Sequence, residues 1–576
     1  MNPPDHLPEP ALDPGVRVRS RSALFATLRR IDGWGPLAWK EMYAAWRIRG
    51  GALTVEPRER EVDPDADHVA LTLILDHGLG ATEPIATADW VLRQAWAQLL
   101  AKAPVALTAV RPTAAVRSTN ACLCAEGRIT LRLVAELPYA GMCLDGRRFA
   151  KLVRQCEMFA AQFARPTPAL VAHRRAVAIQ QALRAALPRY HLCAFLGAGG
   201  VLPRAADGGP AEQADPLVVP AGLRCTIDLG RLGRVTGLGI RHGVTAVAGA
   251  PYHGKSTLLA AIQAGIDDHP PGDGRELVVA DASAVLVQAE EGRRIHAQDL
   301  SGLFAALPGA DARSFTTDRA SGATSMAAST LQAVAAGCRL LLIDEDTAAS
   351  NVLAIDAGMR RLLGRRVAGT TTLLEILPSL AGQGVSTLLV AGATVTSLGA
   401  ADRVILMDHF QPRDVTRAAR RIAPRLRQVA LAIPPRHLIG GERWLGGRHF
   451  LAVDVREPER PVLRLADGTR QALDLRRAGW HLDGPLVIGA IRAAAWCWRL
   501  AEGGCAIRAL GARYEQLIAE RGPAAVDPFH TDGYALPPWQ LVVTVLERLP
   551  APHPSLHRDT AILNSAAGLH SQRHAP

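Results

Sequence analysis

The sequence predicts an α/β fold in which a parallel sheet carries a phosphate-binding loop at one edge. Two observations support this prediction. The apolar run 244–248 leads into a glycine-rich loop, and a helix-like segment, 258–266, follows that loop. A second apolar run, 340–343, ends in the carboxylates of Asp344 and Glu345. Parallel strands buried on both faces read as continuous apolar runs, and ligands bind at the carboxyl ends of such strands.

The glycine-rich loop matches the pattern G-x-x-x-x-G-K-[ST]. Its residues are Gly249, Ala250, Pro251, Tyr252, His253, Gly254, Lys255, Ser256 and Thr257. Glycines allow successive backbone N–H groups to surround an anion, the lysine reaches the outer phosphates, and the serine hydroxyl ligates Mg²⁺. The helix N-terminus behind the loop adds the positive end of its dipole. With a strand before it and a helix after it, the loop predicts a nucleotide site rather than a structural glycine turn.

The carboxylates after the second apolar run form a Walker B element. We expect Asp344 to hold Mg²⁺, directly or through water, and Glu345 to orient or deprotonate the attacking water. Phosphoryl transfer mostly requires positioning and charge neutralisation, which these groups supply. A core strand capped by solvated acids is the alternative, and the phosphate loop upstream disfavours it. Lys255 and Glu345 are therefore the predicted catalytic residues.

A loop rich in serine and glycine lies shortly before the Walker B strand and begins a helical stretch, 326–336. The loop consists of Ser321, Gly322, Ala323, Thr324 and Ser325. It resembles a degenerate signature loop of the ABC ATPases, in which such a loop contacts the γ-phosphate held by the partner subunit. A helix N-cap is an equally good interpretation of Ser321 or Ser325.

The resemblance covers most of the chain and is most specific between residues 237 and 415. Segments 271–276, 320–325 and 344–347, with the pair Tyr252-His253, are similar to the bacterial and protist family described as predicted ATPases of the ABC class. Segments 31–35 and 401–408 resemble the same family. The likeness implies a P-loop NTPase fold with an ABC-type ATPase core, with ATP and Mg²⁺ as cofactors. It also implies a homodimer on ATP binding, because in ABC enzymes each nucleotide lies between two units.

The resemblance bears on two further positions of the site. Gln288 and Gln298 both lie where ABC enzymes carry a glutamine that senses Mg²⁺, and we choose Gln298 because it precedes the helix-like segment 303–307. After the β-rich run 385–390 most ABC ATPases have a histidine that contacts the γ-phosphate, whereas this chain has Gly392 and Ala393. This departure predicts slow turnover or another γ-phosphate contact. We propose that His253 contacts the γ-phosphate in place of that histidine. The alternative is that His253 only fills space in the loop.

Other patterns divide the chain into four parts. Residues 1–165 are predicted to be an α+β accessory domain, with strands at 69–76, 115–123 and 127–137 and a helix at 87–102. Residues 166–437 are the predicted ATPase core, and 438–550 a small α+β domain in which Trp480, Trp496 and Trp498 are core residues. The histidine-containing tail 551–576 is predicted to be disordered.

Composition limits the class of protein. The chain has 576 residues, of which 48% are hydrophobic, and it contains no run of about 18 apolar residues, so a globular protein without a membrane-spanning segment is expected. The nine cysteines form no C-x-x-C pair. This usage favours a cytoplasmic location and disfavours zinc binding.

The formal net charge of +11 favours a polyanionic partner such as RNA or another nucleic acid, although an arginine-rich source proteome explains it equally well. Two segments are candidate contact surfaces, each with a solvated or core-packed segment as the alternative. The first, 15–60, interleaves arginines with Trp34, Trp39, Tyr43 and Trp46. The second carries Arg413, Arg417, Arg420, Arg421, Arg425 and Arg427.

The leading interpretation is a cytoplasmic ABC-class ATPase whose hydrolysis cycle opens and closes a homodimer around a polyanion, RNA. A nucleotide-gated scaffold with negligible hydrolysis is the main alternative, and the absent switch histidine favours it. A small-molecule kinase is a third possibility. The acidic pair Asp344-Glu345, the signature-like loop and the long interval between loop and Walker B strand weigh against a kinase.

Overall fold

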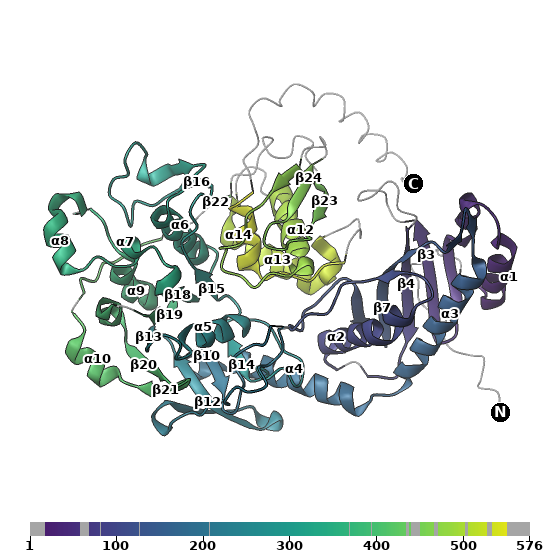
Figure 1. Cartoon of the computed structure of the whole chain (residues 1–576), viewed down its shortest axis with the longest axis horizontal. Coiled ribbons are helices and arrows are strands. Elements are labelled where there is room, and N and C mark those ends of the chain that lie inside the picture. The colour runs from purple at the N-terminus through teal and green to yellow at the C-terminus, as the bar shows by residue number, and fades with distance from the viewer. Residues whose placement is uncertain are drawn as a thin grey trace, which may run out of the picture. The chain divides into compact units, whose positions relative to one another are not determined.

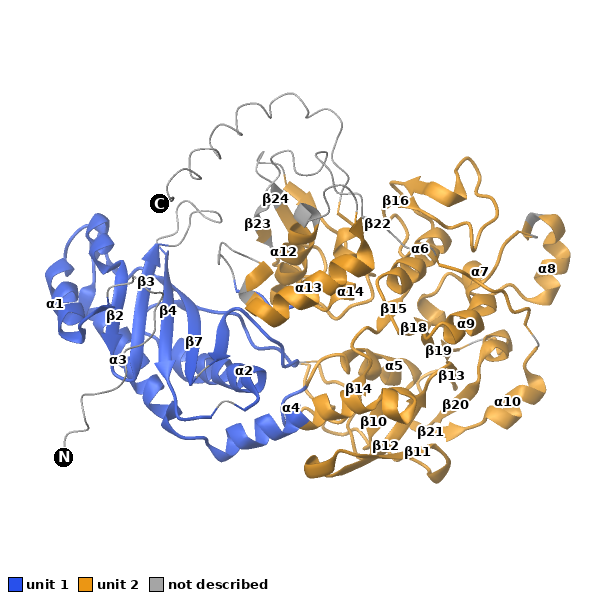
Figure 2. Cartoon of the chain, turned by 180° about the vertical axis from the view of Figure 1, so that it is seen from behind, with its two compact units in different colours: residues 1–178, 269–271, 528–536 blue, residues 179–268, 272–527, 537–576 orange. Residues whose placement is uncertain are grey.

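The computed structural model describes most of the chain in two compact units, shown in blue and orange in Figure 2. Unit 1 comprises residues 1–178, 269–271 and 528–536, and unit 2 comprises 179–268, 272–527 and 537–576. The described residues are 18–57, 68–80, 82–125, 127–206, 208–367, 369–392, 394–424, 426–433, 437–438, 450–465, 470–500, 505–526 and 533–549. The predicted tail, 551–576, lies outside them.

Unit 1 is built on a seven-stranded sheet that is antiparallel except where β1 pairs with β2. The strands are β1 (Val18–Arg19), β2 (Ala44–Ile48), β3 (Gly51–Pro57), β4 (His68–Asp76), β5 (Leu107–Thr108), β6 (Cys122–Ala125) and β7 (Arg128–Glu136). In β7 every second residue from Ile129 is buried, so one face of the strand meets the core. Apolar residues of helices α1 (Arg21–Ile31), α2 (Pro84–Gln94) and α3 (Gly146–Ala160) join the same core.

Predicted elements of this unit are found with one exception. β4 and β7 correspond to the strands expected at 69–76 and 127–137, and α2 begins three residues before the expected helix. The strand expected at 115–123 is wrong, because regular pairing begins only at Cys122. Helix α4 (Pro168–Ala186) runs on from this unit into unit 2.

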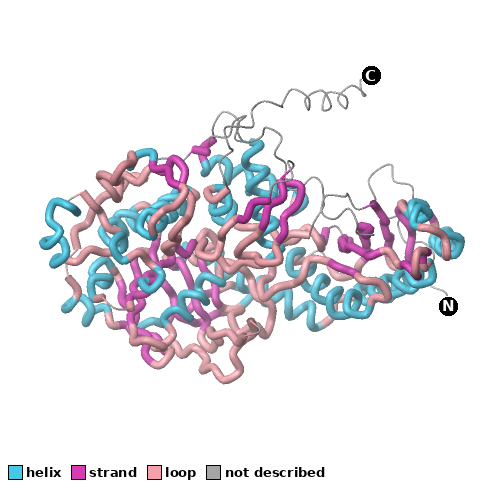
Figure 3. The backbone as a smooth tube through the Cα atoms, turned by 45° about the horizontal axis from the view of Figure 1, so that its top comes forward, coloured by secondary structure: helices cyan, strands magenta, loops and turns pink. Residues whose placement is uncertain are grey.

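Unit 2 contains the parallel sheet that the sequence predicts. Its six strands have the order β15-β18-β19-β13-β20-β21, and every neighbouring pair is parallel except β20–β21. The strands are β13 (Val244–Ala248), β15 (Val285–Val287), β18 (Leu340–Asp344), β19 (Ser386–Ala391), β20 (Arg403–Asp408) and β21 (Gln411–Asp414). Helices α5 (Lys255–Ala264) and α9 (Leu373–Gly382) contact this sheet. Figure 3 shows how helices, in cyan, and strands, in magenta, alternate with loops along the backbone. The predicted α/β fold is confirmed.

A second, antiparallel sheet has the order β11-β12-β10-β14. Its strands are β10 (Leu192–Gly197), β11 (Arg224–Asp228), β12 (Arg234–Arg241) and β14 (Val278–Ala280). Leu258 and Ile262 of α5 are fully buried in a core to which both sheets contribute. The helix behind the phosphate loop is thus held by two sheets.

Shorter elements complete the unit (Figure 1). β16 (Ile295–Gln298) and β17 (Phe315–Thr317) pair as a separate two-stranded sheet. Further helices are α6 (Gly322–Ala335), α7 (Ser350–Leu353), α8 (Ala357–Leu363) and α10 (Thr416–Ile422).

Most of the described C-terminal segment belongs to unit 2 as well. It comprises β22 (His437–Leu438), β23 (Phe450–Asp454), β24 (Val462–Leu465), β25 (Arg470–Ala472), α12 (Gly484–Leu500), β26 (Cys505–Ala506), α13 (Ile507–Arg521) and α14 (Trp539–Leu546). Trp480 is 9% exposed, as expected of a core residue, and Trp496 is half-buried, while the side chain of Trp498 lies outside the described set. No described helix is both long and apolar enough to cross a membrane.

Candidate functional site

The phosphate loop lies between the carboxyl end of β13 and the first residue of α5. Two of its glycines are required by the backbone. Gly249 (φ +154°) has no room for a side chain, because a Cβ there would lie 2.6 Å from the Met407 carbonyl oxygen. Gly254 has φ +93°, in the left-handed region. Tyr252 is 95% exposed, so its ring contributes nothing to the core.

Lys255 is buried although it carries a charge. Its Nζ donates hydrogen bonds to the carbonyl oxygens of Gly249 (2.8 Å) and Ala250 (2.9 Å). The ammonium group therefore lies against the loop, where anionic phosphate oxygens would compete with the neutral carbonyls for it.

Ser256 and Asp344 meet where the loop helix passes the Walker B strand. Ser256 Oγ donates to Asp344 Oδ2 at 3.0 Å, and Asp344 Oδ1 accepts the Asp346 N–H at 3.1 Å. The Asp344 carboxylate is thus oriented by a second hydrogen bond and is only 7% exposed. A hydroxyl and a carboxylate are the hard oxygen donors that Mg²⁺ prefers, so the donor set fits this metal.

Glu345 reaches from the end of β18 to the neighbouring strand. Its Oε2 accepts the Gly392 N–H (2.9 Å) and the Ser397 hydroxyl (3.4 Å). Gly392 follows β19 and occupies the position where the sequence lacks the usual histidine. Ala393 lies outside the described residues. No local sequence pattern points to Ser397, because it lies 52 positions away from Glu345.

His253 is held by the turn between β20 and β21. Its Nδ1 accepts the His409 N–H at 3.2 Å and lies 3.8 Å from Asp408 Oδ1. A hydrogen bond with the His409 ring lowers the pKa of Asp408 below its usual range. Both His409 (φ +48°) and Phe410 (φ +64°) adopt the left-handed conformation that non-glycine residues disfavour. His253 is therefore built into the structure of the loop, and its contact with a γ-phosphate stays a prediction.

The residues of the signature-like loop form the start of α6. Ser321 is its N-cap, and its Oγ accepts the Thr324 N–H at 3.2 Å. Ser325 Oγ donates to the Gly322 carbonyl (2.9 Å) and accepts the Glu290 N–H (2.9 Å). The N-cap interpretation holds for Ser321, while Ser325 connects α6 to the segment after β15.

Comparison with known proteins identifies the family of the domain that carries the phosphate loop. A model of the ABC ATPases, described as their P-loop domain, matches residues 166–439. These residues form an ABC-class P-loop ATPase domain. The class consists of ATP-hydrolysing enzymes, and the matched segment contains the phosphate loop, the signature-like loop and the Walker B strand.

One sequence relative and several solved structures are similar to parts of the chain. It is 35% identical over 176 residues to an uncharacterized protein of Methanocaldococcus jannaschii; the match covers 29% of this chain and 37% of that protein. The chain thus spans little more than a third of that relative. Among solved structures, cbiO1 from Clostridium perfringens, part of an ABC transporter complex, is 15% identical with a TM-score of 0.25, over 39% of this chain and 87% of its own. An ATP-binding cassette of an ABC transporter in its ADP conformation is 11% identical, also with a TM-score of 0.25, over 40% and 94%.

The two glutamines that are candidates for sensing Mg²⁺, Gln288 and Gln298, lie on different sheets or at different sheet edges. Gln298 ends β16, outside the six-stranded sheet, and its buried Nε2 donates to the Asp299 carbonyl. The helix expected at 303–307, on which the choice of Gln298 depended, is wrong, because that segment is turn and loop. Gln288 directly follows β15, in which Val287 lies opposite Ile343 of β18. Gln288 therefore lies at the sheet edge that carries Asp344, and this arrangement disfavours Gln298.

Burial also revises the first candidate nucleic-acid surface. Trp39 and Trp46 are at most 1% exposed and belong to the core of unit 1, so neither can stack on a base. Trp34 is 54% and Tyr43 36% exposed. The sequence could not separate these aromatic residues, because core and surface rings occur within the same short segment. Arg17 lies outside the described residues.

The second candidate surface is the arginine run on and around α10. Some of its arginines are held by other residues, and others are not. Arg413 pairs with Asp408 (3.1 Å) and Arg427 with Glu375 (3.1 Å), so both support the fold. Arg420 donates to the Asp402 carbonyl (3.0 Å). Arg417 and Arg421 are exposed and make no hydrogen bond or ion pair with any described residue. Arg425 lies outside the described set.

Proposed function

We propose that this chain is a Mg²⁺-dependent ATPase that closes as a homodimer on ATP and couples hydrolysis to binding of RNA. One observation supports it most strongly. The Ser256 hydroxyl lies 3.0 Å from Asp344 Oδ2, and the adjacent Glu345 is anchored at the same sheet edge. This constellation joins the phosphate loop to the acidic strand, as metal-assisted phosphoryl transfer requires.

In this mechanism each side chain has a defined task. Lys255 exchanges its two carbonyl partners for phosphate oxygens and neutralises their charge. Ser256 and Asp344 would hold Mg²⁺, which would supply positive charge against the negative charge that develops during phosphoryl transfer. Glu345, whose Oε2 is held by the Gly392 N–H, orients the attacking water through its other oxygen. Gln288, at the end of β15, is our proposed sensor of the metal in place of Gln298.

The homodimer follows from the number of loops. The matched domain carries one phosphate loop and one signature-like loop, so a nucleotide between one of each requires a second chain. In the proposed dimer the first turn of α6, from Gly322 to Ser325, faces the γ-phosphate bound by the partner. The N-terminal backbone N–H groups of this 14-residue helix favour an anion.

RNA is proposed as the polyanion because of charge. The chain carries a formal charge of +11, and unpaired arginines occur on α10.

We place the protein in the cytoplasm, where its free cysteines stay reduced. Burial raises the pKa of the Cys193 and Cys338 thiols to about 12, which leaves them unreactive.

A nucleotide-gated scaffold is the second candidate function, and the replacement of the switch histidine by Gly392 favours it. Glu345→Gln tests the enzyme with its dimer cycle. We expect this variant, with ATP and Mg²⁺, to accumulate as a dimer in size-exclusion chromatography with light scattering, whereas wild type returns to monomer as ATP is consumed. Glu212→Gln, at an exposed site, is the matched control and should behave as wild type. A Glu345→Gln protein that stays monomeric contradicts the proposed cycle.

A further inference from the structure

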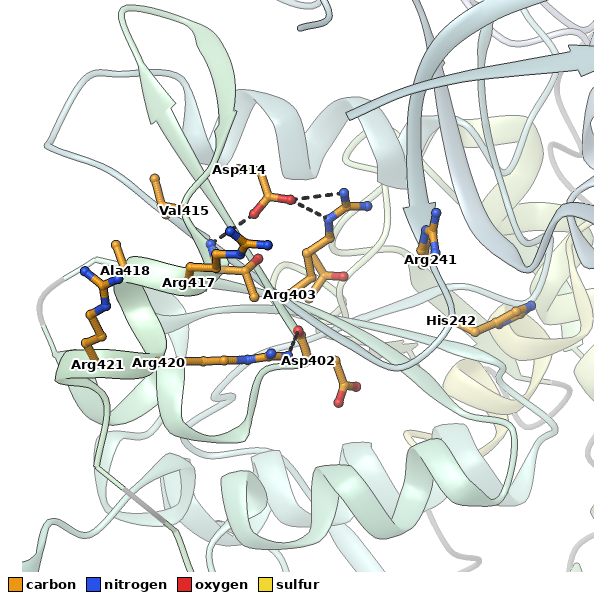
Figure 4. Close-up of a pocket in the computed structure, with 12 residues that line it drawn as sticks. Arg241, His242, Asp402, Arg403, Asp414, Val415, Arg417, Ala418, Arg420 and Arg421 are labelled. Atoms are coloured by element: carbon orange, nitrogen blue, oxygen red, sulfur yellow. Dashed lines mark hydrogen bonds and ion pairs between the residues drawn. The ribbon is translucent and has the colours of Figure 1, made fainter. Parts of the chain in front are cut away.

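An arginine-lined hollow lies at the end of the six-stranded sheet opposite the phosphate loop. Its volume is about 830 Å³. The lining side chains come from the end of β12, the start of β13, the start of β20, the end of β21 and α10. They are Arg241, His242, Thr245, Asp402, Arg403, Asp414, Val415, Thr416, Arg417, Ala418, Arg420 and Arg421 (Figure 4). We call this hollow the arginine pocket. Arg403 begins β20, whereas Asp408, beside the phosphate loop, ends it, so the two sites lie about 16 Å apart along the strand.

The two acidic groups of the arginine pocket are already committed to the fold. Asp402 Oδ2 accepts the Val244 N–H at 2.8 Å. Asp414 Oδ2 accepts hydrogen bonds from Arg403 (3.1 and 3.3 Å), and its Oδ1 accepts the Thr416 N–H (3.0 Å). The carboxylates thus position Arg403 and α10, and they neutralise only part of the positive charge around them.

The remaining charge is strongly positive. Five arginines face two aspartates, and burial lowers the pKa of His242, which keeps this ring neutral at physiological pH. The net charge of the lining is therefore +3. The side chains of Arg241, Arg417 and Arg421 have no ion pair or hydrogen bond with any described residue. Guanidinium groups present paired donors that match phosphate oxygens, and clustered unpaired arginines favour a bound anion.

The chemistry of the lining points to a phosphate backbone rather than a base. None of the described lining residues is Phe, Tyr or Trp, so the pocket offers no large ring for stacking. Arg417 and Arg421 are exposed on α10, and Arg241 stands on the opposite side at the end of β12 (Figure 4). A chain of phosphates can pass between such groups, whereas an enclosed pocket would suit a small metabolite better.

We propose that the arginine pocket binds backbone phosphates of RNA, at a site separate from the ATP site. This inference rests on the proposed function in naming RNA as the polyanion. Contacts to phosphates alone give affinity without sequence preference and make binding depend strongly on salt.

The test measures binding of a fluorescein-labelled single-stranded RNA to the full chain by anisotropy, at several salt concentrations. Arg417→Ala/Arg421→Ala removes two unpaired charges from the pocket. Arg513→Ala/Arg521→Ala removes two exposed charges from α13 and is the matched control. We expect the pocket variant to bind about tenfold more weakly and the slope of log affinity against log salt to fall by about two. Arg417→Lys/Arg421→Lys should restore much of that slope.

Other outcomes overturn the inference in distinguishable ways. If wild type and the pocket variant bind RNA with equal affinity and slope, the pocket is not the site, although RNA stays the polyanion. If no RNA binds but AMP or inorganic phosphate does, and the pocket variant loses that binding, the ligand is a small anion. If nothing binds, both this inference and the RNA part of the proposed function fail, whereas ATP hydrolysis is tested by its own assay.

Discussion

Arg548 and Glu290 form a buried ion pair between the C-terminal segment and the ATPase domain. Arg548 Nε donates to Glu290 Oε2 at 3.1 Å, and the two side chains are 6% and 8% exposed. Ser329 of α6 donates to Glu290 Oε1 at 3.1 Å. Glu290 lies two residues after Gln288. Arg548, two residues beyond the end of α14, is therefore tied to the proposed metal-sensing segment and, through Glu290 and Ser329, to α6.

Breaking this pair should loosen the C-terminal segment. Arg548→Ala removes the nearer of two arginines beside the buried Glu290 carboxylate, while Arg293 Nη1 stays 3.5 Å from Glu290 Oε1. The cost should therefore lie below the about 3–5 kcal/mol of a buried charge left wholly unpaired. We expect a lower unfolding midpoint and faster proteolysis within residues 470–549. Arg513→Ala, an exposed arginine of α13, is the control. Unchanged proteolysis in Arg548→Ala contradicts a structural role for the pair.

The two glutamines give a direct comparison. Gln288→Ala should raise the Mg²⁺ concentration needed for half-maximal hydrolysis by about tenfold, in the range seen when groups around a metal are lost. Gln298→Ala should instead lower the unfolding midpoint, because its side chain is 5% exposed and lies on the β16–β17 sheet. A Mg²⁺ titration of both variants distinguishes them. The opposite pattern restores Gln298 as the sensor.

Glu375 predicts a pH dependence of stability. Burial alone would raise its pKa, but hydrogen bonds from Thr372 and Arg427 outweigh burial and lower the pKa of Glu375 below its usual value. Ionised Glu375 therefore stabilises the fold fully above the unfolded pKa of about 4.3, and this contribution is lost as pH falls through the lower folded pKa.

The variant Glu375→Gln should consequently unfold more easily than wild type at neutral pH. The difference between their unfolding midpoints should shrink as the pH falls below about 4.3. Glu212→Gln, at an exposed site, should show no such trend. A difference that is constant with pH would show that the charge of Glu375 contributes nothing.

Local sequence patterns predicted the parallel sheet and the loop well, because each depends on short segments. The run at 340–343 is continuous and apolar, and the structure buries it completely in β18. The pattern of the phosphate loop specifies a strand, glycines and a helix within a few residues, and β13 and α5 match it.

Contacts between segments far apart in the chain could not be predicted from the sequence. Glu345 meets Gly392, His253 meets His409, and Arg548 meets Glu290, at separations of 47, 156 and 258 residues. No local pattern encodes such pairs, since they depend on strand order. The helix expected at 303–307 is wrong, since this segment turns after β16, while the choice between Gln288 and Gln298 as metal sensor stays a prediction.

The most direct measurement is steady-state ATP hydrolysis by the full chain with Mg²⁺, beside Lys255→Ala and Glu345→Gln. Lys255 lies against the loop and Glu345 beside the proposed metal ligand Asp344, so each variant should lose at least about a hundredfold in rate. That result supports hydrolysis at this site. Hydrolysis by either variant at the wild-type rate, or no hydrolysis by wild type above the Glu345→Gln level with or without RNA, would contradict the account.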